Sequence, residues 1–291
     1  MTVAVAPRRR RPGRSRRHVA RRVALNLAGL LVLVVMAFPV YWMVTTAFKP
    51  GIEITSYTPH WVPYHPTLQH FSDAIHRPYF WDDLENSLIV VSVVVVLSVV
   101  LAFLAAVALA KYRFSGWKIF IVLVILIQML PQSALIIPLY VVLARYHQVN
   151  QLSGLIITYL TFVLPFSIWM LRGFILGIPK DLEEAAMVDG KSRTGAFVGI
   201  LLPLVAPGLV ATSIFAFIQA WNEFIFAYIL LSDQQKQTLT VWLASFLGTS
   251  RGTDWGGLMA GATLTAIPVV IFFLIVQRRI AFGLTAGAVR G

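Results

Sequence analysis

Six apolar stretches, each long enough to cross a lipid bilayer, constrain the fold of this 291-residue chain more than any other feature. A membrane-spanning helix needs about 20 consecutive apolar residues, and helices and closed barrels alone satisfy their backbone groups in lipid. Barrel strands are only about 10 residues long and alternate in polarity. The sequence therefore predicts an all-α polytopic membrane protein with six transmembrane helices. The stretches are 23–48, 86–110, 119–144, 149–171, 203–231 and 255–277.

The composition agrees with a membrane protein and narrows its chemistry. Only 12% of the residues are charged and 58% are hydrophobic, whereas soluble domains carry about 25% charged residues. The chain has no cysteine, which excludes disulfides, thiolate metal sites and cysteine nucleophiles. The net charge of +12 does not indicate a nucleic-acid partner, because the basic residues collect at one set of span ends.

The positions of Lys and Arg predict the orientation of the chain. With a cytoplasmic N-terminus, segments 1–22, 111–118, 172–193 and 278–291 share one side and hold 19 of the 24 basic residues. This bias follows the positive-inside rule. The sequence thus predicts a multi-pass plasma-membrane protein with both termini in the cytoplasm. The five basic residues left outside are Lys49, Arg77, Arg145, Lys236 and Arg251.

The chain divides into two tails and one membrane domain. Residues 1–22 contain nine arginines and are predicted to be a disordered cytoplasmic tail that anchors the topology and contacts anionic lipid. Residues 23–277 form the six-helix domain, and residues 278–291 form a cytoplasmic C-terminal tail.

Two longer segments are predicted to lie outside the cell. Residues 49–85 hold four of the six histidines, but their spacing does not repeat on a helix face, so a packed, partly aromatic cap is expected rather than a metal site. Residues 232–254 are polar, and contact with an external partner remains open for them because exposed loops commonly carry binding.

Catalytic patterns are missing from the sequence. It contains neither an HExxH metal motif nor a GxSxG elbow. Gly190, Lys191 and Ser192 resemble the end of a phosphate-binding loop, but Ala185 stands where that loop needs glycine and no strand precedes it. We therefore expect no enzyme activity, no cofactor and no metal in this chain.

One ionisable side chain, Glu223, interrupts the apolar spans, and it follows Gln219 and Asn222. A charge inside the membrane normally faces an aqueous cavity or a partner. The three residues are therefore candidates for a translocation pathway. A structural hydrogen bond to a neighbouring helix explains Glu223 equally well.

The third span carries a second polar pair, Gln128 and Gln132, four residues apart and hence on one helix face. Pro131 and Pro138 are expected to open this helix and expose carbonyl groups. The two glutamines are candidates for pathway residues that contact a hydroxyl-rich solute. Interhelical hydrogen bonding is the alternative.

Residues 184–203 form a short polar interruption between two spans. Glu184, Asp189, Lys191 and Arg193 fall within ten residues, and the chain then becomes apolar again. On the cytoplasmic side, such a segment offers a contact through which a soluble protein can move the membrane domain.

The spacing in this segment resembles the EAA motif of ABC importer permeases, which reads Glu-Ala-Ala, three residues, Gly, nine residues, Ile, one residue, Leu-Pro. Segments 46–50, 221–224 and 283–291 are similar to the second (MalG-like) permease subunit of maltose-type carbohydrate importers. The resemblance covers residues 20–291. The motif residues are Glu184, Ala185, Ala186, Gly190, Ile200, Leu202 and Pro203.

The resemblance implies a type I importer permease of a bacterial inner membrane that takes up a sugar or oligosaccharide. Its implied partners are an extracytoplasmic binding protein, a homologous (MalF-like) second permease and two ATPases, which bind the ATP and Mg²⁺. The coupling loop, about 177–203, would contact the ATPase through the motif residues and Asp189, with Glu184 paired to a basic residue and Gly190 forming a turn between two short helices. The C-terminal ATPase contacts implied are Thr285, Ala286, Gly287 and Gly291.

An ion-coupled secondary transporter is the alternative function. That class usually relies on inverted repeats, broken helices and buried ionisable residues. Glu223 alone fits this description, and no repeat is apparent.

Overall fold

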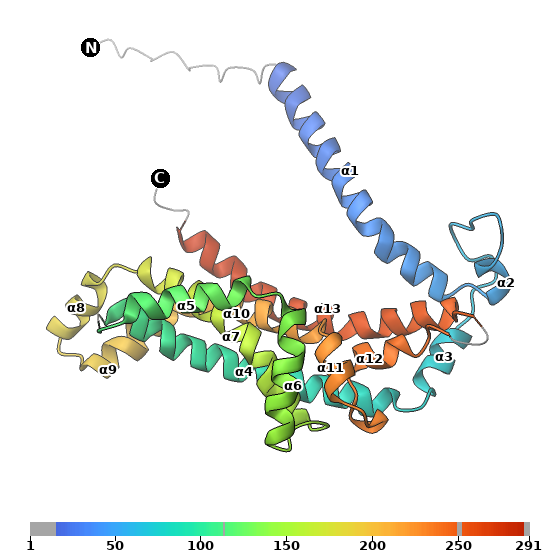
Figure 1. The fold of residues 1–291 in the computed structure, drawn as a ribbon. Helices are drawn as coiled ribbons and strands as arrows, with labels where there is room; N and C mark the ends of the chain where they lie inside the picture. Colours follow the sequence, from blue (N-terminus) through green and yellow to red (C-terminus); the bar gives the residue numbers. More distant parts are fainter. Residues whose placement is uncertain (1–15, 113, 249–251, 288–291) are drawn as a thin grey trace, which may run out of the picture.

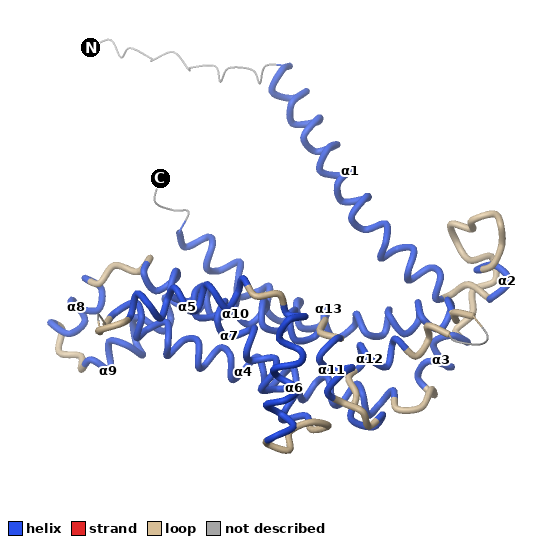
Figure 2. The backbone as a smooth tube through the Cα atoms, in the orientation of Figure 1, coloured by secondary structure: helices blue, strands red, loops and turns tan. Residues whose placement is uncertain are grey.

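A computed structural model describes residues 16–112, 114–248 and 252–287, with side chains described between residues 20 and 277. These parts of the chain contain helices and loops and no β-strand (Figures 1 and 2). The predicted all-α fold is therefore confirmed. The long helices are α1 (Arg16–Ala47), α4 (Phe80–Lys111), α5 (Trp117–Met129), α6 (Ile136–Arg145), α7 (Leu152–Leu176), α10 (Leu202–Trp221) and α13 (Trp255–Gly287); the short elements are α2 (Gly51–Ile54), α3 (Gln69–Ile75), η1 (Gln132–Leu135), α8 (Asp181–Val188), α9 (Arg193–Ala196), η2 (Phe197–Leu201), α11 (Ile225–Leu230), η3 (Gln234–Lys236) and α12 (Leu239–Ala244).

Five described helices are long and apolar enough to cross a membrane, and a bent pair brings the number to six if it counts as one span. The pair corresponds to the predicted third span, 119–144, which is not one continuous helix. Its two halves meet at 100°, because Leu130 and Pro131 adopt extended backbone and Pro131 has no N–H to continue the helix.

This bend corrects the prediction that Gln128 and Gln132 share a helix face. Gln128 lies in α5, whereas Gln132 begins η1 beyond the bend. Pro138 also differs from expectation, since it lies in the first turn of α6, where a missing N–H is tolerated.

Helix ends differ from the predicted spans at three further places. The first helix, α1, begins at Arg16, so residues 16–22 are helical and not part of a disordered tail. The last helix, α13, continues beyond residue 277 to Gly287. The predicted fifth span, 203–231, ends as α10 at Trp221, and the separate helix α11 follows.

The core of the bundle is formed by α4, α7 and α10, which pack along one another, and by α13, which packs along α10. Small residues allow close approach: a Cβ on Gly208 would lie 2.6 Å from the Phe174 ring, and one on Gly257 would lie 2.6 Å from the Phe246 ring. Gly257 and Gly261, which have the GxxxG spacing, pack closely against α12 and Phe246.

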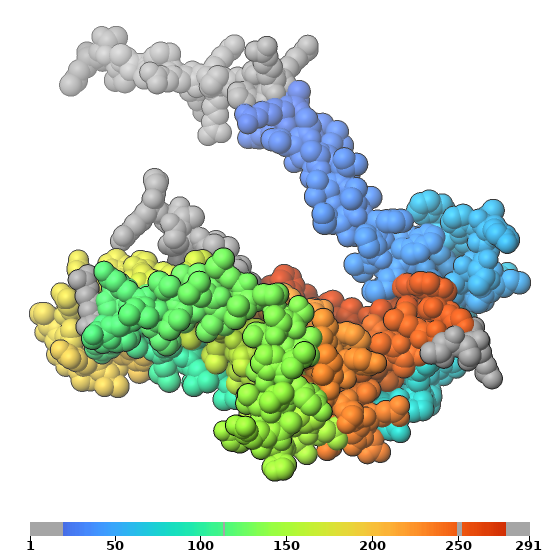
Figure 3. Space-filling view, viewed as in Figure 1, coloured from blue at the N-terminus to red at the C-terminus, as the bar shows by residue number. Residues whose placement is uncertain are grey.

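At one end of the bundle, residues 49–85 form the expected aromatic cap around α2 and α3. The rings of Trp42 and Trp61 lie 5.9 Å apart, and those of Phe48 and Phe71 lie 4.9 Å apart. The helix α1 joins the bundle only here and otherwise stands away from it (Figures 1 and 3). Its most apolar window is 0% buried.

Candidate functional site

The segment predicted to couple the membrane domain to a soluble partner forms two short helices at the end of the bundle opposite the cap (Figure 1). The first, α8, carries Asp181, Glu183 and Glu184 in its first turn, where carboxylates are stabilised by the helix dipole. The second, α9, begins after Ser192, whose hydroxyl accepts a hydrogen bond from the Gly195 N–H at 3.1 Å.

Gly190 connects these helices in a left-handed conformation with φ of +88°. Glycine adopts this conformation without the steric cost that a Cβ brings. The turn implied by the motif is therefore present at Gly190.

The motif residues do not all face solvent. Glu184, Ala185, Asp189 and Gly190 are exposed, whereas Ala186 is only 6% exposed. Ala186 thus packs against its own chain, and Ala185 is the motif alanine that is exposed for contact with a partner.

The last motif residues lead back into the bundle. Ile200 lies in the π-helical element η2 and is half-buried, as is Leu202 at the start of α10. Pro203 is exposed in the first turn of α10, where proline needs no backbone donor. These residues connect the short helices to a spanning helix.

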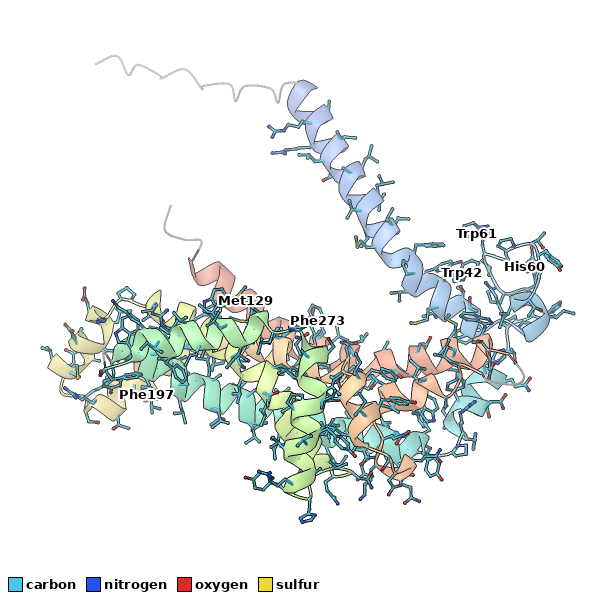
Figure 4. The ribbon with its side chains drawn as sticks, viewed as in Figure 1. Trp42, His60, Trp61, Met129, Phe197 and Phe273 are labelled. Atoms are coloured by element: carbon cyan, nitrogen blue, oxygen red, sulfur yellow. The ribbon has the colours of Figure 1, made fainter. Side chains whose placement is uncertain are left out.

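An ion pair that was not predicted from the sequence ties α8 to the bundle. Lys111, in the last turn of α4, pairs with Glu183 of α8, and both side chains are partly exposed, at 23% and 20%. Beside the pair lies a hollow of about 500 Å³ whose lining includes Met187, Arg193 and Phe197, and Figure 4 shows Phe197 at this end of the molecule. The sequence signals for this ion pair are weak: Glu183 stands beside Glu184, and Lys111 ends an apolar stretch.

The candidate pathway residue Glu223 lies in the break between α10 and α11, not inside a helix. Its carboxylate accepts hydrogen bonds from the N–H groups of Phe226 and Ala227, at 2.8 and 3.1 Å. Its backbone carbonyl accepts one from the Thr240 hydroxyl at 2.8 Å. The Glu223 carboxylate therefore caps α11, and its backbone carbonyl also holds α12 through Thr240.

The other candidate pathway residues are spread over several elements. Gln219 is half-buried in the last turn of α10, and exposed Asn222 donates to the Ile218 carbonyl at 2.8 Å. Gln128 donates to the Phe162 carbonyl of α7 at 3.2 Å, near the Pro165 position, where that helix lacks a donor. Gln219, Asn222 and Glu223 are close in sequence, at the end of α10 and just after it. Gln128 and Gln132, in contrast, lie on either side of the 100° bend.

The candidate C-terminal contacts are described in part. Thr285, Ala286 and Gly287 form the end of α13, while Gly291 lies outside the described residues. Among the described residues, no group of three or more His, Asp or Glu side chains is placed to hold a metal ion.

The described residues thus form a bundle of helices apolar enough to span a membrane, with a pair of short helices exposed at one end. The chain belongs to the family described as binding-protein-dependent transport system inner membrane components, which matches residues 98–285. The resemblance to ABC importer permeases is thereby confirmed.

Individual relatives cover almost the whole chain. A diacetylchitobiose uptake system permease (DasC) of Streptomyces coelicolor is 44% identical, over 93% of this chain and 98% of its own length. A trehalose/maltose transport system permease (MalG) of Thermococcus litoralis is 35% identical, over 95% and 99%. The expected likeness to MalG-type permeases is confirmed by these matches.

A solved structure shares the fold. A chain of a bacterial ABC transporter involved in the import of the acidic polysaccharide alginate superposes with a TM-score of 0.77 and 20% identity, covering 92% of this chain and 99% of its own. An alginate transporter in complex with an alginate pentasaccharide-bound periplasmic protein gives a TM-score of 0.66 at 14% identity, covering 89% and 94%.

Proposed function

We propose that this chain is a permease subunit of an ATP-driven importer that takes up a sugar or oligosaccharide and is coupled to cytoplasmic ATPases through α8 and α9. The observation that carries the proposal is the exposed pair of short helices, which bears Glu184 and Gly190 at the motif spacing. Glu184 is exposed on α8 and free to reach a basic residue of another subunit.

The substrate class is supported by the relatives. Their names specify diacetylchitobiose in one case and trehalose and maltose in another. These are neutral, hydroxyl-rich disaccharides of different linkage, so the proposal extends to saccharides as a class.

The proposed assembly contains the partners that the motif implies. The most apolar window of α1 is 0% buried by the described residues. A homologous second permease would cover much of this helix, and membrane lipid would cover its remaining surface. Two ATPases would bind α8, α9 and the end of α13, and supply ATP and Mg²⁺. A binding protein would dock at the opposite end, on the cap and residues 232–254.

The distribution of basic residues supports an inner-membrane location with both termini in the cytoplasm. The role is non-catalytic, since the chemistry of ATP hydrolysis belongs to the partner subunits. The ion-coupled alternative gains little support, because the Glu223 carboxylate is engaged by two backbone N–H groups.

Charge reversal at Glu184 tests the proposed coupling. In the complete transporter, Glu184→Arg should abolish binding-protein-stimulated ATP hydrolysis and uptake, because it places a like charge against the basic partner proposed for Glu184. Glu184→Asp, which keeps the negative charge at the same exposed position of α8, is the control and should keep most of both activities. Wild-type uptake per ATP in Glu184→Arg would refute the proposed contact.

A further inference from the structure

A small polar hollow lies at the end of the molecule opposite the coupling helices. It has a volume of about 310 Å³ and lies between the end of α1, the chain around α2 and the start of α13. Figure 4 shows two of its residues, Trp42 and His60, gathered where α1 meets the cap. The lining residues that matter here are Trp42, Thr46, Lys49, Glu53, His60 and Trp255.

Thr46 presents an unsatisfied hydroxyl to this hollow. Its side chain is only 6% exposed, and its Oγ1 has no hydrogen-bond partner among the described residues. The neighbouring Thr45 hydroxyl, in contrast, donates to the Trp42 carbonyl at 3.2 Å. A buried hydroxyl without a partner is costly, so Thr46 is suited to a polar ligand.

Lys49 brings a second donor to the same hollow. It is 2% exposed, and its Nζ lies 4.0 Å from the centre of the Trp42 ring. Within the described residues, its ammonium forms no hydrogen bond or ion pair. Burial lowers the pKa of Lys49, and the negative charge of Glu53 partly opposes this shift.

Glu53 supplies a fixed acceptor. Its carboxylate oxygens accept hydrogen bonds from the backbone N–H groups of Tyr64 and His65, both at 3.1 Å, which hold the side chain in place. A carboxylate has about four acceptor positions, so capacity is left for a ligand hydroxyl. With Lys49 and Glu53 facing one hollow, its formal charge is balanced, which favours a neutral ligand over an anion.

Trp255 adds an aromatic surface at the rim. The side chain is 51% exposed and comes from the first turn of α13. An indole face binds apolar C–H groups, while hydroxyl groups of the same ligand require donors and acceptors. A sugar ring presents both: C–H groups on its face and hydroxyl groups around its edge.

We propose that this hollow is a saccharide subsite that holds one ring of the incoming solute, with hydroxyl contacts to Thr46, Lys49 and Glu53 and an aromatic contact to Trp255. The proposal rests on the proposed function, which supplies the substrate class and the extracytoplasmic position. Small-molecule pockets begin at about 300 Å³, so a hollow of this volume suits about one sugar ring.

The experiment uses the complete transporter in lipid nanodiscs without its binding protein, titrated with maltose, trehalose and diacetylchitobiose by saturation-transfer NMR. Thr46→Val removes the hydroxyl at nearly constant volume and should raise the Kd of the bound saccharide about twofold to tenfold. Thr46→Ser keeps the hydroxyl and should bind like wild type, which separates this effect from misfolding. Thr45→Val is the matched control, because that hydroxyl bonds within its own helix.

Trp255→Ala provides an independent arm and should raise the same Kd about fivefold. No saccharide binding by the wild type, or equal Kd values for wild type and Thr46→Val, would overturn the subsite. A loss of binding-protein docking in Thr46→Val, with saccharide binding unchanged, would also overturn the subsite, since the hollow would then receive a protein side chain.

ATP-dependent saccharide uptake, measured in parallel, separates the two proposals. If the wild type shows no such uptake, the proposed function is refuted. If the wild type shows uptake and the saccharide Kd of Thr46→Val equals that of wild type, the subsite alone is refuted.

Discussion

At the scale of single residues, Gly190 determines the shape of the coupling loop. It turns the chain between α8 and α9 with φ of +88°, and a Cβ there would meet no atom within 4 Å. The requirement for glycine is thus conformational and not a matter of space. A left-handed non-glycine residue costs about 1–2 kcal/mol.

We predict that Gly190→Ala lowers saccharide uptake per ATP hydrolysed several-fold, because the strained turn shifts α8 relative to α9. The measurement is coupled ATPase and transport activity in proteoliposomes. Gly173→Ala is the control: this glycine lies within α7 with no atom within 4 Å of an added Cβ, and alanine favours a helix. A coupling ratio equal to wild type in Gly190→Ala would contradict the role of the turn.

Glu223 is the residue whose role the structure changes most. We predict that Glu223→Gln lowers the free energy of unfolding by about 1 kcal/mol, because the amide keeps one acceptor for two backbone donors and loses the charge. Transport per folded transporter should remain within about twofold of wild type on the same reasoning. Thermal unfolding and uptake measured on the same preparation check this. Lost transport with unchanged stability would instead show that Glu223 contacts the solute or a coupled ion.

At the scale of elements, the Lys111–Glu183 ion pair joins α8 to the spanning helix α4. Since α4 packs along α7 and α10, the pair links the coupling helix to the centre of the bundle. Movement of α8 by a partner would therefore pull directly on α4.

We predict that Lys111→Glu and Glu183→Lys each reduce uptake per ATP, because like charges then face each other, and that the double exchange restores most of it. Partly exposed ion pairs contribute up to about 1 kcal/mol, so the double-mutant coupling energy should be of that size. Uptake and ATPase assays on the four variants provide the measurement. Additive losses in the double exchange would mean that the pair transmits nothing.

The elements also show what the sequence can and cannot predict. The apolar stretches predicted the existence of the spans because lipid requires about 20 apolar residues in any fold. The break at residues 222–224 was not predicted, because the apolar sequence on both sides of Asn222 and Glu223 adds up to one stretch long enough to span a bilayer. The helical start at Arg16 was missed because arginine, although charged, is a good helix former.

At the coupling site, local features were predictable and distant ones were not. The Gly190 turn follows from motif spacing within one segment, and the structure has it there. The burial of Ala186 and the pairing of Lys111 with Glu183 depend on packing between segments 72 residues apart. Such contacts arise only when α4 and α8 are brought together in the fold.

At the scale of the whole molecule, the bundle separates the two ends for which we propose functions. The exposed helices α8 and α9 lie at one end, and the cap with its polar hollow lies at the other (Figures 1 and 4). The core of α4, α7, α10 and α13 runs between them. In the proposed importer, movement of an ATPase bound at one end would change access for a saccharide at the other.

The energy source for uptake tests this account most directly. Labelled trehalose, maltose or diacetylchitobiose uptake should be measured in cells with the complete transporter, first with ATP depleted and the proton gradient held, then with the gradient collapsed and ATP held. We predict that uptake stops in the first condition and continues in the second. Uptake that persists without ATP and stops when the gradient collapses would contradict an ATP-driven importer and identify an ion-coupled transporter.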